Sequence, residues 1–101
     1  MNLRLDSKDI RIRLSEREWS ALNEHRQLQQ KFDLGLKQDL AVTLRLSDHN
    51  GYGAENFQVH IFLDQAALQK PLRKKDPYWI YVNEKGVQLS LDVDIIPEEK
   101  R

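Results

Sequence analysis

The chain has 101 residues, 40% of them hydrophobic, and its 16 basic residues balance 16 acidic ones, so its formal net charge is zero. This composition predicts one soluble globular domain over residues 1–101, and the charge balance argues against nucleic-acid binding. The absence of cysteine excludes disulfides, a thiol nucleophile and thiolate metal sites. The opening MNLRLDSKD has no apolar signal-peptide core, and no apolar run approaches the ~20 residues of a membrane span. We therefore expect a cytoplasmic protein without a membrane partner.

The N-terminal part of the chain alternates apolar and polar residues, which predicts strands at residues 2–5 and 9–14. Ser15 and Glu18 then have the spacing of a capping box, in which each side chain bonds the other residue's backbone N–H. This pattern predicts a helix over residues 16–24.

The middle of the chain is predicted to turn at residues 25–26. Apolar residues at alternate positions then predict strands at 28–34 and 40–46. Residues 47–56 (SDHNGYGAEN) contain two glycines and several turn-forming residues, which predicts a loop.

The second half of the chain repeats this order of elements. A strand is predicted at residues 57–63, followed by a helix that Asp64 caps and Pro71 ends. Residues 72–77 are predicted to form a solvated loop, and strands at 78–82 and 87–95 flank a turn at 83–86.

Matching hydrophobic patterns indicate an internal repeat. Ile10, Ile12 and Leu14 recur as Val59, Ile61 and Leu63, 49 positions later, and the run at 40–46 recurs at 89–95. We interpret this as two strand–helix–strand–strand units, at about residues 9–47 and 57–96. The predicted fold is α+β: a mainly antiparallel, strongly twisted sheet of about seven strands with two short helices.

The whole-chain pattern resembles a family of small uncharacterised bacterial proteins, a domain of unknown function. The resemblance is carried by Leu3-Arg4-Leu5, the segment 10–15, Glu18 and Leu22, and by the segments 59–64 and 89–94. It covers nearly the full chain, although residues 47–56 and the aromatic strand at 78–82 depart from the family pattern. The resemblance supports the fold and implies no activity, cofactor or site residue.

Arginines that alternate with apolar neighbours form one candidate site. Clustered guanidinium groups suit phosphates or carboxylates because each can bind two oxygens at once. If the strands are neighbours, the arginines converge on one surface, with a histidine nearby as ligand or base. The alternative is an ordinary solvent face paired with Asp6, Asp92 and Asp94. The candidate anion-binding residues are Arg4, Arg11, Arg13, Arg45 and His60.

Aromatic residues form the other candidate site. The strand at 78–82 carries apolar side chains on both parities, so one of its faces is either exposed or covered by another element. Aromatic and arginine side chains are enriched where proteins bind each other. The candidate residues for binding a protein partner or a second copy are Phe62, Trp79 and Tyr81, rimmed by Arg73, Lys74 and Lys75.

The remaining polar residues carry no catalytic or metal-binding signature. His25, His49 and His60 lack metal-ligand spacing, and the loop that starts at Asp48 has Val59 where a calcium loop requires an acidic residue. We therefore expect no metal, no cofactor and no catalytic residue. The predicted function is a non-catalytic protein-interaction module that uses the aromatic face; the alternative is an anionic-ligand-binding protein or small enzyme that uses the arginines.

Overall fold

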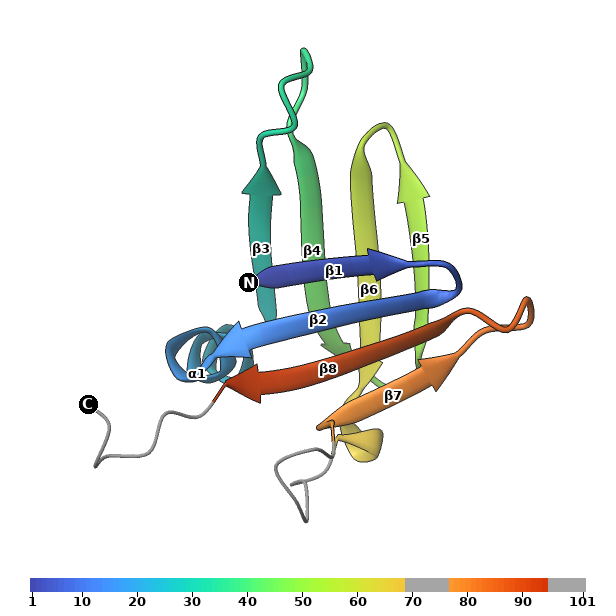
Figure 1. Ribbon diagram of the computed structural model, residues 1–101. Coiled ribbons are helices and arrows are strands. Elements are labelled where there is room, and N and C mark those ends of the chain that lie inside the picture. The colour runs from blue at the N-terminus through green and yellow to red at the C-terminus, as the bar shows by residue number, and fades with distance from the viewer. Residues whose placement is uncertain (69–76, 95–101) are drawn as a thin grey trace. The chain divides into compact units, whose positions relative to one another are not determined.

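The computed structural model describes residues 1–68 and 77–94, in which the strands form two four-stranded sheets (Figure 1). The strands are β1 (Asn2–Asp6), β2 (Asp9–Ser15), β3 (Gln27–Phe32), β4 (Leu40–Ser47), β5 (Gly51–Glu55), β6 (Gln58–Asp64), β7 (Trp79–Val82) and β8 (Gln88–Asp94). The described residues also form one α-helix, α1 (Glu16–His25), and one 3-10 helix, η1 (Gln65–Ala67).

Each sheet is built from two antiparallel hairpins joined by a central parallel pair. Sheet A has the order β1-β2-β8-β7, with β2 parallel to β8, and sheet B has the order β3-β4-β6-β5, with β4 parallel to β6. The chain divides into two compact units. One unit contains sheet A and the start of α1, and the other contains sheet B and the rest of α1.

The prediction of a single sheet of about seven strands with two short helices is wrong. The fold is mostly β, with eight strands in two sheets and one α-helix among the described residues. Short connections correctly indicated antiparallel pairing between neighbours in sequence, as in β1–β2 and β7–β8. They contain no information about the parallel pairs, which join strands that are not consecutive in the chain.

The two sheets are topologically equivalent, because each contains one hairpin from each half of the chain. β1 and β2 correspond to β5 and β6 at the predicted spacing of 49 positions. β4 and β8 correspond at 47 positions, since Ala41 lies opposite Gln58 as Gln88 lies opposite Asp9. A shift of two residues leaves every side chain on the same side of its strand, so the hydrophobic pattern is preserved.

The capping box at the start of α1 is confirmed. The Glu18 backbone N–H donates to Ser15 Oγ at 3.1 Å, and the Ser15 N–H donates to Glu18 Oε1 at 2.9 Å. Glu18 also accepts a hydrogen bond from the N-terminal ammonium of Met1. Arg26 follows α1 with a φ of 64°, the left-handed conformation that commonly ends helices.

The second predicted helix is only the 3-10 turn η1 in the described residues. Asp64 caps it as expected, since Asp64 Oδ1 accepts from the Ala66 N–H at 3.0 Å. The Leu68 N–H donates back to Gln65 O, the three-residue spacing of a 3-10 turn. The residues from 69 to Pro71, where the predicted helix was expected to end, lie outside the described part of the chain.

The predicted loop at residues 47–56 contains a strand that sequence patterning missed. β5 pairs with β6 and leads into a two-residue turn in which Asn56 and Phe57 both have positive φ. Two positive φ values in a two-residue hairpin are those of a type I′ turn, whose twist matches the flanking strands.

Buried apolar side chains occupy one side of each sheet. On sheet A, Leu14, Leu91 and Trp79 are at most 2% exposed, and Trp79 is the register partner of Leu91. On sheet B, Leu44 and Ile61 are register partners and are also at most 2% exposed. Full burial of one such side chain contributes about 1.5–3 kcal/mol, so these rows fix the strand registers and the direction of the polar side chains.

Candidate functional site

Three of the four predicted arginines lie on one side of sheet A, which we call the arginine face. Arg4 on β1 is the register partner of Arg11 on β2. Arg13 lies two residues further along β2 and therefore points to the same side. The hairpin thus places three guanidinium groups next to one another, as their alternation with apolar residues predicts.

The arginine face continues onto β8, where Arg11 is the register partner of Ser90 and Arg13 that of Asp92. An open groove of about 240 Å³ lies on this face, which is smaller than a typical site for a drug-sized ligand and suits a small one. We call it the arginine groove; it is lined by Asn2, Arg4, Arg11, Arg13 and Asp92.

A second, much smaller hollow of about 30 Å³ lies toward the turn end of the same hairpin. Its walls include the carboxylates of Asp6 and Asp9, which are register partners. One oxygen of Asp9 is buried without a hydrogen-bond partner among the described residues. These carboxylates repel anions, so an anion is disfavoured at the turn end of the hairpin.

The three arginines differ in how well they are neutralised. Arg11 Nε donates to Asp9 Oδ2 at 3.1 Å. Within residues 1–68 and 77–94, Arg4 and Arg13 have no carboxylate within ion-pair distance. The groove therefore presents two guanidinium groups with their hydrogen-bonding capacity available.

Arg45 and His60 lie on sheet B, so the structure does not bring them onto the strands of the arginine groove. Arg45 is the register partner of Phe62, and His60 that of Thr43. The topological equivalence of the sheets relates each groove residue to one on sheet B. The equivalents of Asn2, Arg4, Arg11, Arg13 and Asp92 are Gly51, Gly53, His60, Phe62 and Arg45. The arginine cluster is therefore specific to sheet A.

The predicted aromatic residues do not share one sheet. Trp79 is 2% exposed and its ring stacks on Tyr81, with centroids 6.0 Å apart, on the buried side of sheet A. Phe62 is half-buried on sheet B, where the ring of His49 stacks on it with a centroid distance of 5.2 Å. The predicted basic rim, Arg73, Lys74 and Lys75, lies outside the described residues.

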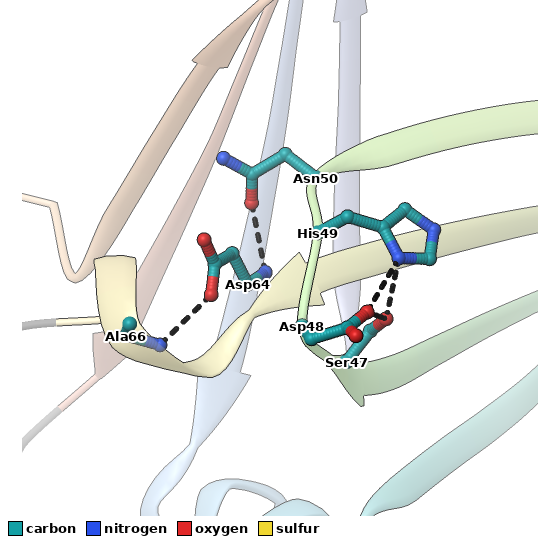
Figure 2. A network of polar contacts seen from close by, with 6 residues as sticks. All are labelled: Ser47, Asp48, His49, Asn50, Asp64 and Ala66. Atoms are coloured by element: carbon teal, nitrogen blue, oxygen red, sulfur yellow. Dashed lines mark hydrogen bonds and ion pairs between the residues drawn. The ribbon is translucent and has the colours of Figure 1, made fainter.

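The turn between β4 and β5 holds a serine, an aspartate and a histidine (Figure 2). Ser47 Oγ and Asp48 Oδ1 lie 2.9 and 3.0 Å from the same ring atom, Nδ1 of His49. In a catalytic triad the serine and the carboxylate contact opposite ring nitrogens, so this arrangement does not activate Ser47. The hydrogen bond to His49 lowers the pKa of the Asp48 carboxyl.

The neighbouring polar contacts of this turn are also structural. Asn50 Oδ1 accepts from the Asp64 backbone N–H at 2.8 Å, which ties the turn to the end of β6 (Figure 2). No cluster of three metal-ligating side chains occurs in the described part of the chain. None of its helices is long and apolar enough to cross a membrane.

Sequence reasoning missed Asn2 as a groove residue and favoured Asp92 as a partner for arginine over a role in a carboxylate pair with Asp94. Asn2 shares the parity of Arg4, which was the available signal. The position of Asp92 depends on the parallel pairing of β2 and β8, which no local pattern indicates.

No family model, curated protein or solved structure matches the chain. The fold and the groove therefore define the chain only as a small, mostly β protein with an arginine-lined surface groove. Membership of the bacterial family that the sequence resembles stays a prediction.

Proposed function

We propose that the chain binds a small anionic ligand, with a phosphate or carboxylate group, in the arginine groove. The observation that carries this proposal is the convergence of Arg4, Arg11 and Arg13 on one groove, two of them without an ion pair among the described residues. Guanidinium groups bind carboxylate and phosphate oxygens in pairs, and such charge-assisted hydrogen bonds are about twice as strong as neutral ones.

The cross-strand pairing of Arg4 and Arg11 gives a second reason. Like charges directly opposite each other on a sheet are destabilising. A bound anion offsets that repulsion, so the ligand-bound protein is stabilised relative to the free protein.

A partner-binding aromatic surface is less well supported. Trp79, the expected anchor, is 2% exposed, and an anchor residue must be available to a partner. His60, the expected base, lies on a strand of sheet B, so the proposal is binding without catalysis.

Isothermal titration calorimetry with inorganic phosphate at low ionic strength tests the proposal. Arg13→Gln should weaken binding about tenfold, because it removes one charged hydrogen-bond donor. Arg45→Gln is the matched control. It also removes an arginine from a strand, but Arg45 lies on sheet B, at the position equivalent to that of Asp92 on sheet A. Equal affinities for both variants and the wild-type protein, or no binding of phosphate at all, would contradict the proposal.

A further inference from the structure

Among the residues that the structure describes, Asp92 is the one acidic residue that lines the arginine groove. It is the register partner of Arg13 on the neighbouring parallel strand, and yet the two side chains form no ion pair. Arg11, by contrast, is paired with Asp9 at 3.1 Å. Within the described residues, the groove therefore holds the Asp92 carboxylate beside guanidinium groups, and Asp92 forms no ion pair with any of them.

This juxtaposition has a direct consequence for what binds. A carboxylate in an anion site repels a simple anion and lowers its affinity. A ligand with an ammonium group next to its anionic group converts that repulsion into attraction. Arg13 and Asp92 lie on adjacent strands and line one groove of about 240 Å³, so a short linker between the two charged groups of the ligand suits this site.

We infer that the ligand of the arginine groove is a phosphate monoester that carries an ammonium group on a short linker, as in O-phosphoethanolamine. The phosphate binds Arg4, Arg11 and Arg13, and the ammonium group binds Asp92. Three arginines suit a phosphate monoester, whose phosphate group has three acceptor oxygens, better than a carboxylate, which has two. This inference rests on the proposed function and adds the ligand class.

The test compares O-phosphoethanolamine with ethyl phosphate, which differs from it by the ammonium group. The wild-type protein should bind O-phosphoethanolamine about threefold tighter, the scale of one exposed ion pair. Asp92→Asn should remove this preference and bind ethyl phosphate tighter than the wild type does. Asp94→Asn is the matched control, because Asp94 lies on the same side of β8 but does not line the groove.

Tighter binding of ethyl phosphate by Asp92→Asn cannot come from partial unfolding, because partial unfolding weakens the binding of both ligands. If both ligands bind equally to the wild type, or Asp92→Asn keeps the preference, the inference is overturned while the proposed anion site stands. If neither ligand binds, the proposed function itself fails.

Discussion

Arg4 and Arg11 are direct register partners on adjacent strands, so two arginine side chains leave the β1–β2 hairpin side by side on the same face. Cross-strand pairs on one side of a sheet interact, and like charges in that position destabilise it. The arrangement is costly for the free protein and favourable for an anion-bound one.

Arg4→Gln should therefore stabilise the free protein at low ionic strength by up to about 1 kcal/mol, because it removes the like-charge pair. The same change should reduce the stabilisation that phosphate gives to the wild type. Urea unfolding with and without phosphate measures both effects. A variant that is less stable than the wild type in the absence of phosphate would show that the pair is not repulsive.

Trp79→Ala should destabilise the protein by about 3–5 kcal/mol, the usual cost of truncating a buried tryptophan. Ile80→Ala is the matched control on the next residue, because Ile80 is 51% exposed and its truncation should cost less than about 0.5 kcal/mol. Chemical denaturation of the two variants makes the comparison. Similar losses for both would contradict the burial of Trp79.

Glu18 should stabilise the protein at neutral pH, and this stabilisation should be lost in acid. Partial burial acts to raise the pKa of its carboxyl, but hydrogen bonds from the N-terminal ammonium and from Ser15 outweigh burial and lower the pKa. A lowered folded-state pKa stabilises the protein above the ordinary glutamate pKa, and this contribution is lost as pH falls through the folded-state value.

Glu18→Gln should accordingly reduce the free energy of unfolding at neutral pH and have a smaller effect in acid, where the wild-type carboxyl is protonated. Urea unfolding at both pH values measures the difference. Glu24→Gln, on the last turn of α1, is the control and should not reproduce this pH dependence. An effect of Glu18→Gln that is independent of pH would rule out the carboxylate as its cause.

Substitution by alanine should change the stability of the protein in opposite directions at two glycines. Gly86 has a φ of 80° in the β7–β8 turn, so Gly86→Ala should destabilise the protein by about 1–2 kcal/mol. A Cβ at Gly53 meets no atom within 4 Å. Gly53→Ala should therefore stabilise the protein by about 0.4–1 kcal/mol, because alanine lowers the conformational entropy of the unfolded chain. Melting temperatures of the two variants test this, and shifts of the same sign would contradict it.

Local features of the fold were predictable from the sequence. The capping box of Ser15 and Glu18 depends only on residues three apart, and the β1–β2 hairpin on a short alternating run. β5 was not predictable, because Gly51 and Gly53 remove the side chains that mark a strand. Apolar residues at every position of β7, from Trp79 to Val82, left no alternation to indicate which side was buried.

The candidate site was predictable to the same extent. Alternation along β1 and β2 placed Arg4, Arg11 and Arg13 on one side of their strands, which the structure confirms. Arg45 lies on a different sheet from the other arginines, and Asp92 lies beside Arg13, because of how strands that are not consecutive in the chain pair with each other. That pairing is a property of the whole chain, so it could not be inferred from local residue patterns.

The most direct test of the anion site is a titration of the isotope-labelled protein with phosphate, followed through backbone amide chemical shifts. The site predicts saturable shifts concentrated at Arg4, Arg11 and Arg13 and at Asp92, all on sheet A. Shifts concentrated on sheet B around Arg45, or shifts that do not saturate anywhere, would contradict it.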